Sequence, residues 1–412
     1  MRTWPSLYLP PLTQGFTFSP LSLFDSAQHQ LRTLESKPLY RMYVCGITPY
    51  DATHLGHAAT YLTFDIIHRY LRASGADVLF TENATDVDDP LLERAARDGV
   101  DWRELAQDQI ELFFSDMVAL HILPPQNYVG VVESIDVIAN AVKEIQERGF
   151  AYDVDGDLYC EIEKDPNFGR RSHLERNELL QLFAERGGDP ERERKRSPFD
   201  PLLWRKKREG DPSWPSVVGE GRPGWHIECQ AIALHHLGAN PTGSLIDIQG
   251  GGSDLIFPHH EMSASQTFLQ TGREFAEFYV HSGMIGLDGE KMSKSRGNLV
   301  FVSRLIKSGV DPMAIRIALL SQHYQKDRMW SDETLDFGIS ALALLRRALA
   351  LESCAPSHDV IQSVIEDLAD NLNTPAAIEK IIAWAHSSLN GGEGGNSGEM
   401  SRAIDLLLGL AL

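Results

Sequence analysis

The chain has 412 residues, of which 42% are hydrophobic and 23% are charged, and its formal net charge is −20. This composition is typical of a globular protein with two or three domains, and the negative charge works against loose binding to a polyanion. Four scattered cysteines are too few for a disulfide scaffold. The first residues lack the apolar run of a signal peptide, and no window approaches the roughly 18 apolar residues of a membrane span, so we expect a cytoplasmic protein without membrane contact.

The first part of the chain alternates short strands with longer helices. After an irregular arm at 1–38, which holds an edge strand at 21–24, strands are expected at 40–44 and 78–80 and helices at 55–73, from 90 onward and at 101–120. In the helix at 55–73, apolar residues recur every three or four positions. Asp89 is expected to cap the following helix, with Pro90 in its first position. The alternation predicts a doubly wound parallel sheet.

Residues 126–220 are predicted to form an insertion between two halves of the sheet. A helical pattern at 133–148 and a hairpin at 152–162 come first. Two charged runs follow within residues 170–208, where twelve basic residues stand against seven acidic ones. Both a solvated flexible loop and a lid or substrate contact remain open for this region.

The sheet is expected to resume with strands at 225–229 and 246–249. The second strand ends in Gly250 to Gly252, which permit close backbone approach to a ligand, although a tight structural turn explains three glycines equally well. Asp311 and Pro312 open a helix, and from about residue 313 to the end the chain reads as a bundle of helices. Further helices begin near 331 and 360, and a final pair follows.

Two short segments carry residues that suit phosphate chemistry. His54 and His57 flank Gly56 at the start of a predicted helix, so two imidazoles can approach an anion that lies close to the backbone. Much later, the run Lys-Met-Ser-Lys-Ser brings Lys291 and Lys294, which can neutralise the charge of a triphosphate. Each signal alone is weak, because a glycine between two histidines occurs by chance in many helices. Together they resemble the paired signatures of class I aminoacyl-tRNA synthetases, which implies ATP and adenylate chemistry.

Three further residues form a candidate metal site. Cys45, Cys229 and His259 each fall at the end of a predicted strand or in the loop beyond it, at the same edge of the sheet. Two thiolates and an imidazole suit zinc. Each residue alone also fits an ordinary buried core position, and a spacing across more than two hundred residues has little diagnostic power. Zinc is therefore a hypothesis here.

A longer series of motifs resembles the cysteinyl-tRNA synthetase family over residues 40–375. The segments are Tyr43-Val-Cys-Gly-Ile-Thr48, Asn83-Ala-Thr-Asp-Val-Asp-Asp89, Pro212-Ser-Trp-Pro-Ser216, Gly224-Trp-His-Ile-Glu-Cys229 and Gly250-Gly-Gly-Ser-Asp-Leu-Ile-Phe-Pro-His-His-Glu261. In that family, zinc at the amino-acid site binds the thiolate of cysteine and so separates cysteine from serine. The resemblance implies one zinc ion per chain, held by the three candidate ligands.

Three departures from the synthetase pattern point to one branch of that family. Where the synthetases have a glutamate as fourth zinc ligand, this chain has Ser263, and Glu261 does not match that position. The sequence runs only 37 residues past Pro375, too few for an anticodon-binding module, so no tRNA partner is expected. Together with the insertion Glu185-Arg-Gly-Gly-Asp-Pro190, these departures resemble the mycothiol ligase branch, whose members join cysteine to the amine of glucosaminyl-inositol.

This resemblance implies an α/β fold with a Rossmann-like doubly wound parallel sheet, a connective insertion and a C-terminal helical bundle. Its nucleotide-binding catalytic domain would consist of 1–125 and 221–312, separated by the insertion at 126–220, with the helical domain at 313–412. We expect a monomer.

The reaction implied by the resemblance uses ATP with Mg²⁺, L-cysteine and glucosaminyl-inositol, and passes through cysteinyl-AMP. His54, His57, Lys291 and Lys294 would stabilise the phosphates, and Asp254 would orient or deprotonate the acceptor amine. The residues expected to line the adenylate are Cys45, Gly46, Ile47, Thr48, Thr60, Asn83, Ala84, Thr85, Trp225, Gly252, Ser253, Asp254 and Ile285. A truncated cysteinyl-tRNA synthetase and a catalytically silent paralogue that senses cysteine or an adenylate are the alternatives.

Overall fold

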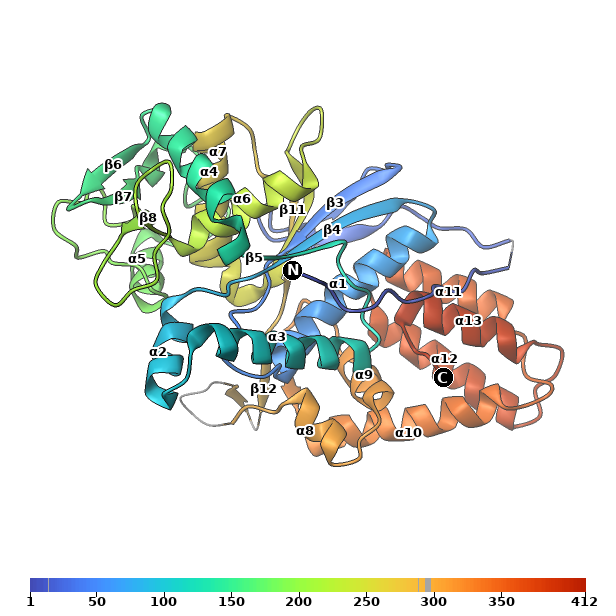
Figure 1. Ribbon diagram of the computed structural model, residues 1–412. Coiled ribbons are helices and arrows are strands. Elements are labelled where there is room, and N and C mark those ends of the chain that lie inside the picture. Colours follow the sequence, from blue (N-terminus) through green and yellow to red (C-terminus); the bar gives the residue numbers. More distant parts are fainter. Residues whose placement is uncertain (14, 288, 293–297) are drawn as a thin grey trace.

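The computed structural model describes residues 1–13, 15–287, 289–292 and 298–412. At its centre lies a parallel sheet of five strands in the order β11-β10-β3-β4-β5 (Figure 1). The strands are β3 (Leu39–Val44), β4 (Asp77–Ala84), β5 (Asn127–Gly130), β10 (Ile246–Gly252) and β11 (Ala276–Ser282). The chain adds β4 and β5 on one side of β3 and later β10 and β11 on the other. The boundary between β3 and β10 is therefore a topological switch point, where doubly wound sheets bind ligands, and the predicted α/β fold class is confirmed.

Side chains alternate along β3 between the two faces of the sheet. Met42 and Val44 belong to the core that contains α1 (Leu55–Ala73), whereas Tyr43 and Cys45 belong to the core that contains α6 (Trp225–Leu237). The bounds of α1 agree with its apolar pattern. Because Cys45 follows the alternation of the strand, its side chain lies on the α6 side of the sheet.

The region between the two halves of the sheet carries a second, antiparallel sheet in the order β6-β7-β8-β9, shown in green in Figure 1. Its elements are β6 (Ala151–Val154), β7 (Asp157–Cys160), β8 (Leu202–Lys206), β9 (Gly221–Pro223), α4 (Ile135–Glu147) and α5 (Arg176–Glu185). The hairpin expected at 152–162 is formed by β6 and β7. The strand β5 falls inside the range 126–220 but pairs with β4 in the central sheet, and the domain bounds themselves stay a prediction.

Helices make up most of the C-terminal region, as expected, although it also contains the strand β14 (Arg328–Trp330), which pairs with β12 (Ile285–Leu287). The helices are α9 (Pro312–Leu320), α10 (Asp332–Leu349), α11 (His358–Ala369), α12 (Thr374–Leu389) and α13 (Ser397–Leu408). The other elements are β1 (Ser22–Asp25), β2 (Gln30–Thr33), α2 (Asp89–Asp98), α3 (Trp102–Ala119), α7 (Glu261–Thr271), α8 (Val302–Lys307) and β13 (Glu290–Lys291). Within the described ranges, no helix combines the length and apolar character needed to cross a bilayer.

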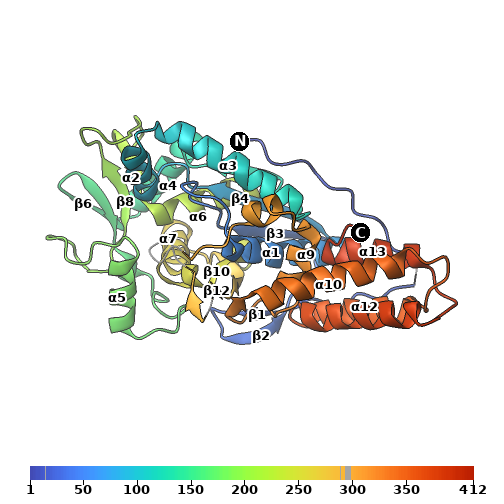
Figure 2. The same ribbon diagram turned by 90° about the horizontal axis from the view of Figure 1, so that it is seen from below.

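The N-terminal arm connects distant parts of the molecule. Figure 2 shows it passing from α3 to the C-terminal helices. Trp4 donates a hydrogen bond to the carbonyl of Ile122 at 2.9 Å, and further along the arm Thr13 donates to Glu399 of α13 at 2.6 Å. The strand expected at 21–24 is present as β1, but it pairs with β2 in a separate hairpin and not with the edge of the central sheet.

The strand predicted at 225–229 is wrong, because these residues begin the helix α6. Most residues of α6 are buried, so its apolar residues show no helical period within a short window. Gly224 is the N-cap residue and Gly238 the C-cap residue, which a strand between two turns would also allow. Cys229 therefore lies about one turn inside a helix and not at the end of a strand.

Two smaller expectations also differ from the structure. Gly250 to Gly252 form the end of β10 and not a turn after it. A Cβ atom on Gly250 would lie 2.2 Å from the ring of Phe64, so the absence of a side chain lets α1 pack closely against the sheet. The side chain that caps α2 belongs to Asp88, which accepts from the amide of Asp89 at 2.8 Å, so the predicted cap is displaced by one residue.

A buried ion cluster joins α1 to the C-terminal helices. The carboxylate of Asp65 accepts from Arg69 Nε at 2.8 Å, from Arg316 Nη2 and from the amide of Leu123 at 2.9 Å. Arg316, on α9, also donates from Nε to the carbonyl of Leu408 at 2.7 Å. Burial alone raises the pKa of Asp65, but the two guanidinium groups and the Leu123 amide outweigh it and hold the pKa at about 2.

Replacing Asp65 with asparagine should lower the free energy of unfolding at pH 7 by about 3–5 kcal/mol, because two buried guanidinium groups lose their counter-charge. Urea denaturation measures this change. Since the folded pKa of about 2 lies below the ordinary value of 3.8, the Asp65 contribution is full above pH 3.8 and is lost as the pH falls through 2. The exposed pair Asp155 and Arg194 supplies a control, because Asp155→Asn should leave the denaturation midpoint unchanged. Equal midpoints for Asp65→Asn and the wild type would refute the role of the cluster.

Candidate active site and metal centre

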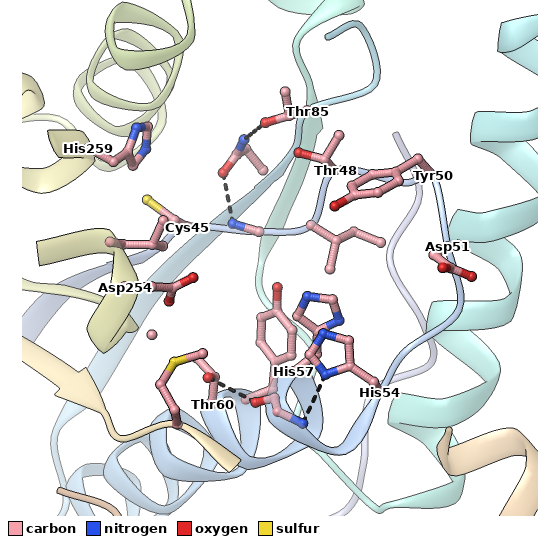
Figure 3. A pocket seen from close by; sticks show the side chains of 18 of the residues that line it. Cys45, Thr48, Tyr50, Asp51, His54, His57, Thr60, Thr85, Asp254 and His259 are labelled. Atoms are coloured by element: carbon pink, nitrogen blue, oxygen red, sulfur yellow. Dashed lines mark hydrogen bonds between the residues drawn. The ribbon is translucent and has the colours of Figure 1, made fainter. Parts of the chain in front are cut away.

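A cavity of about 370 Å³ opens at the carboxyl ends of β3, β4 and β10, next to the switch point of the sheet (Figure 3). Most residues expected at the site line it. These are Cys45, Gly46, Ile47, Thr48, His54, His57, Thr60, Asn83, Thr85, Trp225, Cys229, Gly252, Asp254 and His259. The fold therefore brings together, in one cavity, residues that span more than half of the chain.

Some expected residues lie elsewhere. Ala84 is buried at the end of β4, Ser253 begins a short 3-10 turn and Ile285 is buried in β12, and none of the three lines the cavity. The backbone of Lys291 belongs to β13, but its side chain is outside the structural description. Lys294 lies outside the described residues altogether. The phosphate roles of the two lysines stay a prediction.

Several lining residues were not anticipated. They are Tyr50, Asp51, Tyr61, Leu255, Gly283, Met284, Met292 and Leu299, whereas Gly56, which also lines the cavity, was expected beside the anion. Tyr50 and Asp51 lie in the turn-rich loop before α1, so their nearness in sequence to His54 was a usable signal. Gly283 and Met284 follow β11, whose carboxyl end meets the same edge of the sheet, but this strand carries no motif that marks it.

Asn83 holds the loop after β3 in place. Its side-chain oxygen accepts from Tyr43 Oη at 2.9 Å and from the amide of Gly46 at 3.0 Å, and its Nδ2 donates to Thr85 Oγ1 at 3.2 Å. A Cβ atom on Gly46 would lie 1.5 Å from the Asn83 carbonyl oxygen, so only glycine permits this approach. The backbone of Gly46 to Thr48 is thereby presented to the cavity in a defined position.

The start of α1 forms one end of the cavity. The rings of His54 and His57 stack with centroids 3.9 Å apart and an angle of 23° between their planes. His54 Nδ1 accepts from the amide of Gly56 at 3.0 Å, and a Cβ atom on Gly56 would lie 2.8 Å from the His54 ring. The helix N-terminus adds its partial positive charge to the two imidazoles. This end of the cavity therefore suits a phosphate group.

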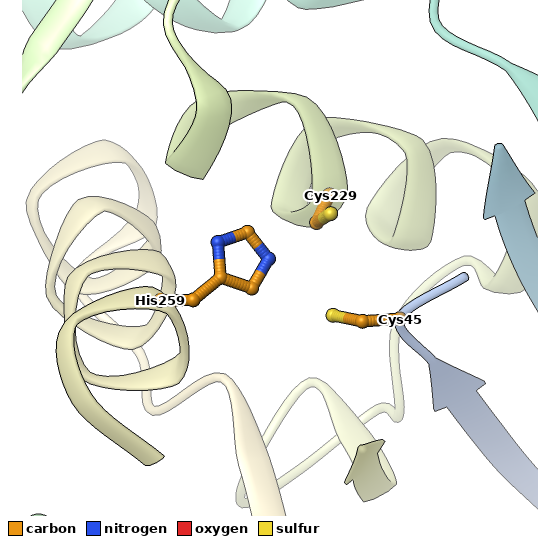
Figure 4. Close-up of side chains that lie close together, drawn as sticks. All are labelled: Cys45, Cys229 and His259. Carbon is orange, nitrogen blue, oxygen red and sulfur yellow. The ribbon is translucent and has the colours of Figure 1, made fainter. Parts of the chain in front are cut away.

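The opposite end of the cavity carries the candidate metal ligands (Figures 3 and 4). Cys45 follows β3, Cys229 lies on α6, and His259 lies in the turn Ile256–His260 before α7. All three are buried, and their ligand atoms lie within 4.8 Å of one another. Two sulfurs and one imidazole nitrogen are a donor set that zinc prefers, and three protein ligands leave a position for a substrate. The predicted constellation is therefore assembled in space.

The surroundings of His259 fit a metal ligand. Its Nδ1 lies 3.0 Å from Nδ1 of His226, and its ring stacks on Trp225 with centroids 4.3 Å apart. Its Nε2 is buried and has no hydrogen-bond partner within the described part of the chain. If His259 donates from Nδ1 to His226, the lone pair of Nε2 remains available to a metal.

The two thiols differ in their electrostatic surroundings. Burial raises the pKa of Cys45 well above its ordinary value, and the hydrogen bond to Cys229 raises it further. Burial opposes ionisation of Cys229 too, but the hydrogen bond from Cys45 and the nearby His259 lower its pKa well below the ordinary value. A thiolate at Cys229 is the form that binds zinc.

Neither Ser263 nor Glu261, the two residues that the sequence analysis compared with a fourth zinc ligand, completes the ligand set. Ser263 donates from Oγ to the carbonyl of His226 at 3.0 Å. The Glu261 carboxylate accepts from the amides of Gly169 at 3.0 Å and Ser172 at 2.9 Å. Both side chains are committed to other partners, in agreement with the expectation that Glu261 is not the fourth zinc ligand.

The basic residues of the insertion are largely engaged in ion pairs. Arg205 of the insertion and Arg222, which follows it in β9, both contact Asp89 at the start of α2. Arg192 and Arg208 both contact the buried carboxylate of Asp157, at 2.9 and 2.8 Å. These contacts hold the charged runs against the body of the protein, and none of these residues lines the cavity.

Comparisons with known proteins place the chain in a family. Residues 31–339 match the family model described as tRNA synthetases class I (C) catalytic domain. The L-cysteine:1D-myo-inositol 2-amino-2-deoxy-alpha-D-glucopyranoside ligase of Nocardia farcinica is 52% identical over 419 residues, and that of Thermomonospora curvata is 51% identical, with 100% of each chain covered in both cases. The Mycobacterium tuberculosis methionyl-tRNA synthetase bound to methionyl-adenylate shares the fold, with a TM-score of 0.63, 18% identity and coverage of 91% of this chain and 89% of that one. This chain therefore belongs to the family of the class I (C) tRNA synthetase catalytic domains.

Proposed function

We propose that this chain joins L-cysteine to the amine of glucosaminyl-inositol in mycothiol biosynthesis, at the expense of ATP. Relatives that carry the name of this ligase match the chain from end to end at about half of its positions. The observation that carries the proposal is the division of the cavity, with a thiol-binding donor set at one end and a phosphate-binding helix start at the other. An enzyme that activates cysteine with ATP needs both.

The reaction has two steps. The carboxylate of cysteine attacks the α-phosphorus of ATP, so that cysteinyl-AMP forms and pyrophosphate leaves. The neutral amine of glucosaminyl-inositol then attacks the carbonyl carbon, an amide bond forms, and AMP departs as the proton of the amine is released. Atoms and charge balance without an oxidant or reductant.

The metal end of the cavity selects the amino acid. Zinc held by Cys45, Cys229 and His259 would supply a Lewis acid that favours a thiolate over a hydroxyl. Trp225 stacks on His259 and lines the cavity, so it limits the space beside the bound side chain. The site therefore recognises cysteine both by its sulfur and by its size.

The helix end of the cavity serves the phosphates. His54 and His57 would donate to the leaving pyrophosphate, and Lys291 and Lys294 would add positive charge together with Mg²⁺. The backbone of Gly46 to Thr48, which Asn83 holds in place, lines the part of the cavity where the nucleotide would bind. Asp254 lines the cavity between the two ends, from where its carboxylate could orient or deprotonate the acceptor amine.

The acceptor of the cysteinyl group is the decisive test. The protein should convert ATP, radiolabelled cysteine and glucosaminyl-inositol into labelled cysteinyl-glucosaminyl-inositol, AMP and pyrophosphate, separated by thin-layer chromatography. The same protein with tRNA should give no acid-precipitable label. Labelled tRNA with unchanged aminosugar would instead identify a cysteinyl-tRNA synthetase, and the absence of cysteine-dependent ATP–pyrophosphate exchange would indicate a silent paralogue.

The metal site predicts a direct effect on zinc content. Cys229→Ala should remove most of the zinc, measured by elemental analysis, and should raise KM for cysteine in pyrophosphate exchange by about 100-fold, because only two ligands remain. Cys354 is a buried cysteine on the C-terminal side of the protein, so Cys354→Ala should retain the metal and the KM. One full equivalent of zinc in purified Cys229→Ala would contradict the assignment.

The stacked histidines predict an effect on turnover. His57→Ala should reduce kcat for pyrophosphate exchange by about 10²–10³-fold, because a donor to the developing phosphate charge is lost. KM for cysteine and zinc content should stay close to the wild-type values. His386→Ala, on the exposed face of α12, is the matched control. Unchanged kcat in His57→Ala would exclude a role in the first step.

A further inference from the structure

The segment between β10 and α7 carries two side chains that line the cavity. Residues of the insertion at 126–220 form hydrogen bonds with both ends of this segment. Asp254 and His259 both belong to this segment and both line the cavity. At its first end, Arg186 donates from Nη1 to the carbonyls of Asp254 and Phe257. At its second end, Glu261 accepts from backbone amides of the insertion. The candidate metal ligand thus lies between two anchors that come from another part of the chain.

Within the insertion, the run Glu185-Arg-Gly-Gly-Asp-Pro190 directs Arg186 toward this segment. The helix α5 ends at Glu185, and Gly187 then takes a positive φ of 87°, which favours glycine. The amide of Gly188 donates to the carbonyl of Phe183 at 2.8 Å, and a Cβ atom on Gly188 would lie 2.6 Å from the Phe183 ring. The two glycines therefore close the helix tightly and leave Arg186 beside the wall of the cavity.

The residues that follow Arg186 are bound to the antiparallel sheet and to one another. Asp189 accepts from Tyr159 Oη of β7 and from Lys195 Nζ at 2.9 Å. The Lys195 side chain is only 2% exposed, and its Nζ also donates to the carbonyl of Pro198 at 3.0 Å. These contacts tie the segment after α5 to the antiparallel sheet, so the anchor that bears Arg186 has a fixed base.

The second anchor rests on a buried carboxylate. Glu261 is 1% exposed and accepts from Arg171 Nη1 at 3.1 Å in addition to the two amides. Arg171 also pairs with Asp165 at 3.1 Å and with Glu274 at 3.0 Å. This network connects the insertion to the first turn of α7, two residues beyond His259.

We propose that Arg186 and Glu261 are positioning residues that hold His259 in the geometry required for the metal. This is the role of the run from Glu185 to Pro190, which carries Arg186. The inference rests on the proposed function through the metal site. Arg186 does not line the cavity, so it acts on the backbone of the segment and not on a substrate. Both hydrogen bonds come from Nη1, so one nitrogen of the guanidinium joins two carbonyls of the segment.

The test compares Arg186→Gln with Arg186→Lys in the full-length protein loaded with zinc. The rate of zinc transfer to a chromogenic chelator reports the metal site independently of activity. Arg186→Gln should transfer zinc about 10-fold faster and raise KM for cysteine by a similar factor, while KM for ATP stays within about twofold. Arg186→Lys should lie between Arg186→Gln and the wild type. Arg194→Gln is the matched control, because Arg194 belongs to the same insertion but pairs with the exposed Asp155.

Glu261→Gln should reproduce the faster zinc transfer from the other end of the segment. Wild-type zinc transfer and KM for cysteine in Arg186→Gln would overturn the proposal. A common rise in both KM values with a lower Tm would overturn it as well, since that pattern describes general destabilisation. A wild-type protein that binds no zinc would contradict the proposed metal site. If the wild type binds zinc but the variants keep its rate of zinc transfer and its KM for cysteine, only the positioning role is contradicted.

Discussion

The alternation of side chains at the end of β3 is the constraint on which the site depends. Tyr43 and Cys45 face the same side of the sheet as α6, and Asn83 on β4 receives hydrogen bonds from Tyr43 and Gly46. A shift of one residue in the register of β3 would turn Cys45 toward α1 and away from Cys229. The parallel pairing of β3 with β4 and β10 prevents that shift, so the sheet itself sets the geometry of the metal donors.

The cavity separates two chemical tasks by placing them at opposite ends. Soft donors that suit a thiolate come from β3, α6 and the turn before α7, whereas stacked imidazoles and a helix N-terminus that suit a phosphate come from the start of α1. A cysteine bound by its sulfur at one end would point its carboxylate toward the other. The spatial order of the two ends thus gives the direction in which an adenylate would form.

The insertion contributes to this site through structure and not through exposed charge. Its arginines pair with Asp89 and Asp157, and the chain as a whole carries a net charge of −20. A surface that binds a polynucleotide needs free cations, because counterion release drives that binding. The same insertion sends Arg186 to the backbone beside Asp254. The sequence of its charged runs suggested a solvated loop or a lid. In the structure, most of these charges form ion pairs that hold the insertion against the rest of the protein.

The sequence by itself determined the alternating α/β pattern and the bounds of α1, because local periodicity records these features directly. Short motifs pointed to His54 and His57 as candidate phosphate ligands, and the family resemblance pointed to the three candidate metal donors, all of which the fold brings to one cavity. It did not determine that 225–229 is helical, since a segment buried on all sides loses the period that distinguishes a helix from a strand. Nor did it reveal the contacts that Arg186 makes with the carbonyls of Asp254 and Phe257, or the pairing of Asp89, because contacts between residues far apart in the chain leave no local trace. Only the packing of the insertion against the sheet decided which charges are structural and which remain at the site.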